Sequence, residues 1–355
     1  MKQMVRVVRS RIIIIKINTY MLIIFCILLL SACTTASTSI PPWDSSPDAL
    51  RMLYSDSEYI AQRGRGVTRA AAETDGTAQL ARFLNTQVSS QLRIAERESI
   101  QNGTVQSSTL IEQETFIKSQ MNLFGVRYAQ NAYFNKQQKE WITVAYIDRN
   151  EAWKVYSPRF KQQAESFTQL LSAAENETDP FRKALRFTAA QNYLRTADYQ
   201  NADILGQLLH PVKMNEEFAA VRSQVSRLPG LLDNTRRNAS VHIECPGDFE
   251  SLVTNVFSRE FAALGFPVAN NRNSASAICR ITIIEGMQQR DLGIFYHPSL
   301  QAVITSNSAQ STETLFTFSA DGERAQAVTP DVAKRRAYQS LADKVKENFR
   351  AEFNK

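Results

Sequence analysis

Residues 151–238 contain no strand pattern, and this long interruption restricts the fold of the chain more than any other feature. Apolar side chains recur there at helical spacing over about six turns, namely Trp153, Tyr156, Phe160, Ala164, Phe167, Leu171 and Ala174. Asp179 and Pro180 then supply a capping acid and a proline at the first position of a second helix. A shorter third helix is expected from 215 to 228, ending at Pro229. The sequence therefore predicts a helical segment between two regions of different pattern.

The region before this segment, 55–150, alternates between strand and helix patterns. We expect strands at 58–62, 126–134 and 141–147, and helices at 68–90 and 109–121, the first of them capped by Thr68. Both faces of the 141–147 strand are mostly apolar, which is typical of a strand covered on both sides. Gly76 lies inside an alanine-rich helix, where glycine costs about 1 kcal/mol relative to alanine. We therefore expect Gly76 to mark a close approach of helix and sheet.

The region after the segment, 239–355, has the order β-α-β-β-β-β-α. Strands are expected at 241–245, 267–269, 277–285, 300–306 and 314–319, and helices at 249–264 and 331–349. Gly265 is the expected stop of the first of these helices. The predicted fold class is α+β: two two-layer α/β sandwich domains, 55–150 and 239–355, joined by the helical segment 151–238.

The N-terminus has the form of a secretory signal. The first sixteen residues include five Lys and Arg and no acid, and an uncharged apolar stretch from Ile17 to Leu30 follows. This stretch is too short between its flanks for a comfortable membrane span. Leu30, Ser31, Ala32 and Cys33 then form a lipobox, at which a bacterial signal peptidase cuts before the cysteine. We therefore expect residues 1–32 to be a cleaved lipoprotein signal.

Cys33 is the predicted attachment point of a covalent lipid, with a diacylglycerol on its thiol and a further acyl chain, such as palmitate, on its freed amine. Each buried CH₂ contributes about 0.8 kcal/mol, so two or more chains hold a protein on a bilayer durably. Thr34 follows the cysteine, which in diderm sorting favours the outer membrane with the body facing the periplasm. Residues 33–54 are interpreted as the lipidated cysteine and a flexible tether. We expect no other cofactor.

The basic character of the chain belongs largely to the signal. The whole sequence has 41 Lys and Arg against 35 Asp and Glu, and removing the five cations of residues 1–32 leaves 36 against 35. Nucleic-acid binding requires a basic face. No run in the mature sequence provides one, because Arg63-Gly64-Arg65-Gly66 is too short. We expect no nucleic-acid partner.

Two cysteines remain beside Cys33 after processing, in a compartment where disulfides form. Cys245 ends one expected strand and Cys279 begins another. If these strands run parallel, we expect the thiols at opposite ends of the sheet, too far apart for disulfide geometry. A Cys245–Cys279 disulfide and two buried free thiols both stay open, and the second is the preferred interpretation.

Catalytic and metal-binding candidates are few, because the chain has three histidines, His210, His242 and His297. His242 and Glu244 share one face of an expected strand, but a metal site needs three converging ligands, which nothing nearby in the sequence supplies. Cys245 points away from His242, which excludes a Cys–His pair on that strand. The sequence contains no phosphate loop, dinucleotide fingerprint, nucleophile elbow or zinc-binding helix motif. We expect no metal site and no enzyme.

Three segments of residues 55–150 share a pattern of small and apolar residues: YIAQRGRG at 59–66, AAAETDGTAQLARFLNTQV at 70–88 and WITVAYID at 141–148. In this pattern the region resembles the Lpp-twenty family of envelope lipoproteins and the N-terminal domain of FlgT, a periplasmic ring component of some flagellar motors. Residues 239–355 resemble, more loosely, the N-terminal α/β domain of TolB and the middle domain of FlgT. The resemblance implies no catalytic residues in this chain.

These features predict a non-catalytic outer-membrane lipoprotein facing the periplasm. We expect a structural or assembly component of the cell envelope, to which the resemblance adds a flagellar association. Its expected partners are the bilayer, through Cys33, and an envelope protein or a second copy of the chain. The alternative is a surface-exposed ligand-binding lipoprotein or adhesin, because sorting rules vary between envelopes. A third functional hypothesis is a hydrolase whose active site contains His242 and His297.

Overall fold

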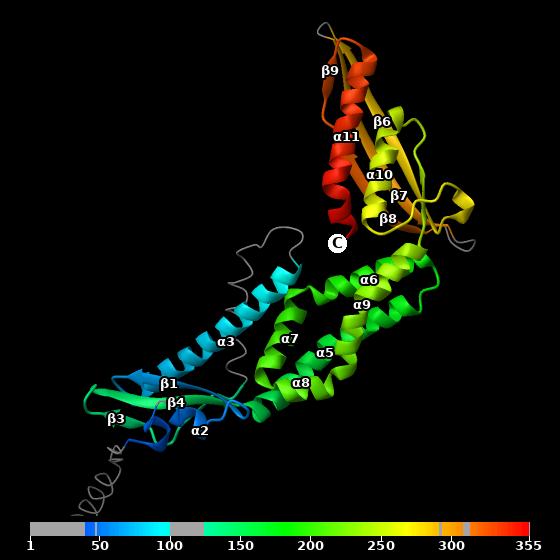
Figure 1. Cartoon of the computed structure of the whole chain (residues 1–355). Coiled ribbons are helices and arrows are strands. Elements are labelled where there is room, and N and C mark those ends of the chain that lie inside the picture. Colours follow the sequence, from blue (N-terminus) through cyan, green and yellow to red (C-terminus); the bar gives the residue numbers. More distant parts are fainter. Residues whose placement is uncertain (1–39, 47, 100–123, 291–292, 308–312, 355) are drawn as a thin grey trace, which may run out of the picture. The chain divides into compact units, whose positions relative to one another are not determined.

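The structure, a computed structural model, describes residues 40–46, 48–99, 124–290, 293–307 and 313–354. The chain divides into two compact units (Figure 1). Within these ranges, unit 1 comprises the residues up to 86 together with 124–152, and unit 2 comprises 87–99 and the residues from 153 onward. Helices and open sheets together confirm the predicted α+β fold class. Among the helices in these ranges, none has the length and apolar character needed to cross a membrane.

Unit 1 contains an antiparallel sheet with β4 at its centre. Its elements are η1 (Pro42–Asp44), α2 (Ala49–Leu53), β1 (Tyr59–Gly66), α3 (Arg69–Ser99, which continues into unit 2), β2 (Arg127–Tyr128), β3 (Tyr133–Asn135) and β4 (Glu140–Asp148). β1 pairs with β4 along its whole length, whereas β2 and β3 pair with β4 in two short stretches. The single strand expected at 126–134 is therefore two strands. Thr68 caps α3 as predicted, because its hydroxyl accepts the N–H of Ala71 at 3.1 Å.

β1 is longer than the strand expected at 58–62, because it continues through Gly64 to Gly66. The helix α3 packs directly on these two glycines. A Cβ on Gly64 would come within 2.1 Å of the carbonyl oxygen of Ala72, and one on Gly66 within 2.6 Å of the Ala72 nitrogen. A Cβ on Gly76 would come within 2.8 Å of an alanine Cβ in β4. The prediction that Gly76 marks a close approach is confirmed, and the strand glycines serve the same contact.

The second face of this sheet is covered by the segment 40–54. Trp43 is 2% exposed and packs in one cluster with Ala129, Tyr133, Ile142 and Val144. The tether expected over 33–54 is thereby shortened, because the folded body begins at Pro41 rather than after residue 54. β4 is consequently buried on both faces, as its apolar pattern predicts.

The helical part of the chain consists of α5 (Arg149–Glu175), α6 (Pro180–Leu194), α7 (Ala197–Leu209), α8 (Pro211–Glu217) and α9 (Ala219–Asn238). Asp179 caps α6 as predicted, because its Oδ1 accepts the N–H of Arg182 at 2.8 Å. The expected helix end at Pro229 is wrong, since α9 continues through it. Leu228 and Leu232, on either side of the proline, are buried in the same helical core. This packing holds the helix together across the backbone hydrogen bond that proline cannot make.

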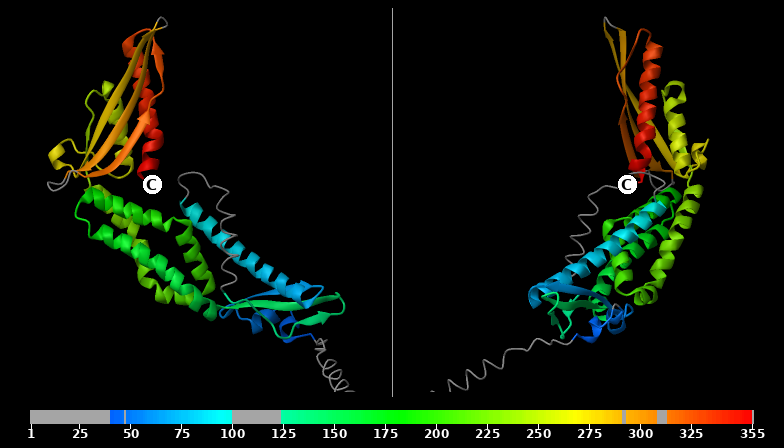
Figure 2. Two further views of the ribbon diagram at one scale, coloured as in Figure 1. Left: turned by 180° about the vertical axis from the view of Figure 1, so that it is seen from behind. Right: turned by 60° about the vertical axis from the view of Figure 1, so that its left-hand side comes forward.

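The C-terminal part of unit 2 is a sheet with two helices on one face (Figures 1 and 2). Its main elements are β5 (Val241–Glu244), α10 (Leu252–Ala263), β6 (Ala277–Arg290), β7 (Gly293–Ser306), β8 (Thr314–Asp321), β9 (Ala325–Ala327) and α11 (Pro330–Phe353). The strand order is β5-β6-β7-β8, with β9 on β7, and only the β5–β6 pair is parallel among the described strands. The strand expected at 267–269 is reduced to one bridge between Val241 and Val268.

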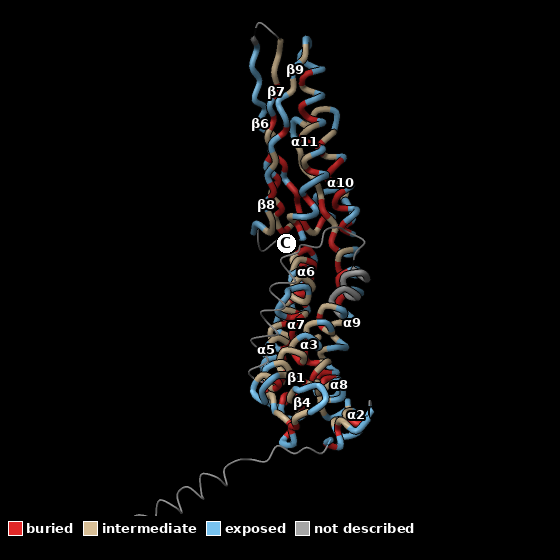
Figure 3. The backbone as a smooth tube through the Cα atoms, turned by 90° about the vertical axis from the view of Figure 1, so that its left-hand side faces the viewer, coloured by how far each residue is buried: buried red, intermediate tan, exposed pale blue. Residues whose placement is uncertain are grey.

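The helical part and this sandwich share a core, so the sequence boundary at 238/239 is not a boundary between compact units. Phe181 of α6 lies 4.9 Å from Phe266 and 6.1 Å from Phe353, measured between ring centroids. Buried residues line the space between α10, α11 and the sheet (Figure 3). The carboxylate of Asp179 also accepts a hydrogen bond from the hydroxyl of Ser306 in β7.

Candidate functional site

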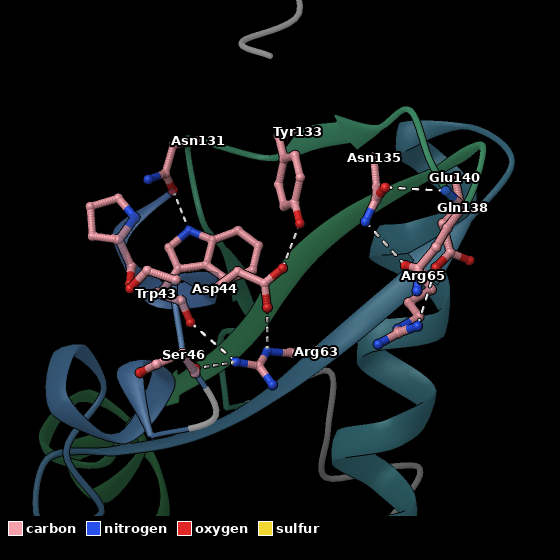
Figure 4. Close-up of polar contacts among 12 residues, drawn as sticks. Trp43, Asp44, Ser46, Arg63, Arg65, Asn131, Tyr133, Asn135, Gln138 and Glu140 are labelled. Carbon is pink, nitrogen blue, oxygen red and sulfur yellow. Dashed lines mark hydrogen bonds and ion pairs between the residues drawn. The ribbon is translucent and has the colours of Figure 1, made fainter. Parts of the chain in front are cut away.

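Trp43 and Asp44, near the start of the described residues, are held on unit 1 by a polar cluster, called here the N-terminal clamp: Trp43, Asp44, Arg63, Asn131 and Tyr133 (Figure 4). Asp44 Oδ1 lies 3.0 Å from Arg63 Nε, and Asp44 Oδ2 accepts the Tyr133 hydroxyl at 2.5 Å. Trp43 Nε1 donates to Asn131 Oδ1 at 2.7 Å. The clamp therefore joins η1 to β1, to β3 and to the β2–β3 connection.

Arg63 is the centre of the clamp. Strand alternation places it on the face of β1 opposite Gly64 and α3, and its guanidinium also donates to the carbonyl oxygens of Trp43 at 3.3 Å and Ser46 at 3.4 Å. The side chains of Arg63 and Asp44 are 28% and 18% exposed. Fully exposed ion pairs contribute about 0–1 kcal/mol to stability. The Arg63–Asp44 pair is more shielded from solvent than such pairs, and neighbouring hydrogen bonds reinforce it.

Tyr133 adds a pH-dependent contact to the clamp. Burial first, and then the hydrogen bond to Asp44, raise the pKa of Tyr133 to about 12. The hydroxyl therefore stays protonated and keeps donating throughout the neutral range. Because the folded pKa lies above the ordinary tyrosine value of about 10, this contribution to stability is complete below about pH 10 and is lost as the pH rises through about 12.

The clamp shortens the distance over which the folded body can move from a lipid on Cys33. Eight residue steps separate Cys33 from Pro41, and an extended chain spans at most about 3.6 Å per step, or about 29 Å in all. The donors and acceptors of the clamp bind one another, so the arrangement attaches a segment of chain rather than activating a nucleophile.

The structure places Cys245 and Cys279 differently from the expectation. β5 and β6 are parallel, but Ile243 pairs with Cys279, so Cys245 lies two positions along on the same face and not at the opposite end of the sheet. Diagonal neighbours on paired strands are about 7–8 Å apart, beyond the usual range for a disulfide. Both cysteines are free thiols. Burial raises the pKa of Cys245 to about 12 and also raises that of Cys279, which keeps both thiols in their unreactive form.

His210, His242 and Glu244 make structural contacts, whereas His297 is exposed on β7 opposite Gly286 of β6. His242 Nδ1 lies 2.9 Å from the carbonyl oxygen of Ala269, and Glu244 forms ion pairs with Arg272 and Arg280, both at 3.2 Å. His210 Nδ1 accepts the N–H of Lys213 and caps α8. Across the described ranges, no three His, Cys, Asp or Glu side chains are grouped to hold a metal ion. The lipobox residues Leu30–Cys33 lie outside the described residues.

Glu285 is expected from the sequence to be a solvated turn residue near a strand end, but it lies inside β6, where its side chain is 34% exposed and bound by two neighbours. Its Oε1 lies 2.7 Å from Lys334 Nζ and accepts the hydroxyl of Tyr338 at 2.5 Å. Burial acts to raise the pKa of Glu285, but the hydrogen bonds from Lys334 and Tyr338 outweigh it and the pKa is lowered. The carboxylate therefore stays charged and connects β6 to α11.

Comparisons with known proteins identify no family for this chain. No protein-family model matches it, and no curated protein matches it either. The resemblance to the Lpp-twenty family therefore stays a prediction.

Among solved structures, the chain is similar to the secreted protein HP1454 of Helicobacter pylori, with 13% identity, coverage of 83% of this chain and 97% of that chain, and a TM-score of 0.34. A minor lipoprotein of Acinetobacter baumannii shows 15% identity over 32% of this chain and 94% of that chain, with a TM-score of 0.23. Lipoprotein GNA1162 of Neisseria meningitidis shows 15% identity over 27% and 91%, with a TM-score of 0.19. TM-scores this low do not establish a common fold.

Proposed function

We propose that this protein is a lipoprotein of the outer membrane, anchored through Cys33 and facing the periplasm, where it is a non-catalytic structural or assembly component of the cell envelope. The observation that carries the proposal is the N-terminal clamp, which attaches the tenth and eleventh residues after the lipobox cysteine, Trp43 and Asp44, to the folded body. In such a chain, a lipid on Cys33 holds the folded body close to the membrane through a short stretch of polypeptide. The flagellar association implied by the family resemblance remains a finer prediction.

A non-catalytic role is supported by the contacts of the groups that catalysis would use. Raised pKa values keep Cys245 and Cys279 protonated, and Glu244 is held between two arginines. Glu285 is bound by Lys334 and Tyr338. Each of these groups already serves a contact within the fold.

Lipidation is tested on protein purified from membranes. We expect the N-terminal peptide to begin at Cys33 and to carry a diacylglycerol and an acyl chain, detected by mass spectrometry. Cys33→Ala is expected to abolish labelling by palmitate and to retain residues 1–32, because the peptidase requires the cysteine. Cys26→Ala, inside the signal, is the matched control and keeps full labelling. Labelling that persists in Cys33→Ala would contradict the anchor.

An assembly role is supported by an open edge of the C-terminal sheet. β5 pairs only with residues 277–280 of β6, and no described segment pairs with the same edge of β6 beyond that point. Ile284 and Met287 are 66% and 58% exposed along this stretch. An open strand edge presents backbone N–H and C=O groups to which another strand can add.

This role is tested by photocrosslinking in intact cells, with benzoylphenylalanine in place of Ile284 in the full-length chain. We expect a discrete covalent adduct, either with an envelope protein or with a second copy of the chain. The same probe at Val328, which is 91% exposed in unit 2, is the matched control and is expected to give no such band. Equal yields at both positions, or no adduct at either, would refute the assembly role.

A further inference from the structure

Three large apolar side chains are exposed at the start of unit 1: Ile40, Met52 and Leu53, called here the anchor-side patch. Their exposed fractions are 64%, 79% and 53%. α2 buries Ala49 against the body and leaves Met52 and Leu53 outward, so these two side chains do not serve the core. Single exposed apolar residues are ordinary on protein surfaces, but here they occur on the segment nearest the predicted lipid.

We propose that the anchor-side patch lies against the bilayer that holds the lipid of Cys33. The inference rests on the proposed anchoring and adds to it a second, non-covalent contact with the same membrane. It assigns the patch a lipid surface as its occupant, rather than a protein.

The length of chain before the patch supports this occupant. Ile40 is seven residues from Cys33, and seven extended residues span at most about 25 Å. α2 is packed against η1, which directly follows Ile40 and Pro41, and Figure 1 shows α2 beside the first described residues of the chain. The clamp then prevents this segment from moving away from the rest of unit 1. The patch is therefore confined to the vicinity of the membrane surface.

Tethering also lowers the affinity that such a contact requires. Once the lipid is inserted, contact between patch and bilayer is an intramolecular event with a high effective concentration. A few apolar side chains, which would not recruit a free protein to a membrane, can then orient a protein that is already attached.

The charges around the patch indicate an apolar contact rather than an electrostatic one. Arg51 is exposed beside Met52, but Asp48, Asp56 and Glu58 are exposed nearby. The segment therefore has no excess of positive charge with which to attract anionic headgroups. Immersion of the patch should depend little on whether the vesicles contain anionic lipid.

The experiment uses the full lipidated protein reconstituted in phosphatidylethanolamine vesicles, with and without phosphatidylglycerol. A cysteine introduced by Met52→Cys is labelled with an environment-sensitive nitrobenzoxadiazole dye, and quenching by nitroxide on the lipid acyl chains is measured. The control is Val67→Cys, at an 81% exposed position of unit 1 just after β1. Protein without the introduced cysteine provides the labelling background, and Leu53→Cys is a second patch position.

We expect quenching at positions 52 and 53 to exceed that at position 67 at least threefold, with blue-shifted emission, in both lipid mixtures. Protein that floats with the vesicles but shows equal, weak quenching at all three positions would overturn the inference and leave the anchoring intact. Strong quenching that appears only with phosphatidylglycerol would overturn the apolar contact. Protein that does not float at all would refute the anchoring, and the inference with it.

Discussion

Replacing Gly64 with alanine is expected to destabilise unit 1 by about 3 kcal/mol or more, at the upper end of overpacking effects. A Cβ at this position would come within 2.1 Å of the carbonyl oxygen of Ala72 and 2.4 Å of the nitrogen of Gly76. Both atoms belong to the backbone of α3, so no side-chain rotation relieves the clash. The helix would have to move off the sheet, and the buried contacts between them would be lost.

Hydrogen exchange of peptides from β1 and β4 measures this effect without requiring the two units to unfold together. A loss of about 3 kcal/mol corresponds to roughly a hundredfold faster exchange, while peptides from β6 and β7 keep their rates. Gly230→Ala in α9 is the matched control, because a Cβ there meets nothing within 4 Å. Unchanged exchange in Gly64→Ala would show that α3 does not lie as closely on β1 as the structure has it.

Replacing Trp43 with alanine is expected to cost about 3–5 kcal/mol locally, as for other large aromatic truncations in cores, and to release the segment 40–54 from the sheet. The indole is 2% exposed, packs on Tyr133 at 5.9 Å between centroids and donates to Asn131. Its removal leaves a cavity over β4 and separates the remaining clamp contacts from their apolar support.

Limited proteolysis followed by mass spectrometry detects this release. We expect new early cleavages after Arg51 and Arg63 in Trp43→Ala, at enzyme concentrations that leave the unaltered protein intact. Met52→Ala, which changes an exposed residue of the same segment, is the control and should be cut no faster than the parent protein. A Trp43→Ala protein as resistant as the parent would mean that the segment is held by contacts other than the clamp.

Local signals in the sequence were sufficient for most elements. Alternation identifies β4 and β5, while Thr68 and Asp179 identify two helix starts because each side chain bonds to the backbone three residues on. The position of Gly76 was informative for the same reason, since a helix glycine next to alanines has few roles other than close packing. These patterns depend on neighbours within a few residues, which a single sequence displays directly.

The clamp could not be predicted in this way, because its contacts join positions far apart in the chain. Trp43 and Asn131 are 88 residues apart, and Asp44 and Tyr133 are 89 apart. Small polar residues and prolines around Trp43 resemble a flexible tether, and the only contrary signal was a tryptophan within it. Similarly, the register that brings Cys245 beside Cys279 depends on the short length of β5, which strand patterning does not determine.

The buried indole of Trp43 also affects how the protein should be produced for study. A recombinant fragment that begins at residue 55 would lack one of the two layers over β4 and would expose Ile142, Val144 and Tyr133 to solvent. Soluble material for crystallography or binding work should therefore begin between Thr34 and Pro41, because such a start omits Cys33 and its lipid while retaining the whole packed unit.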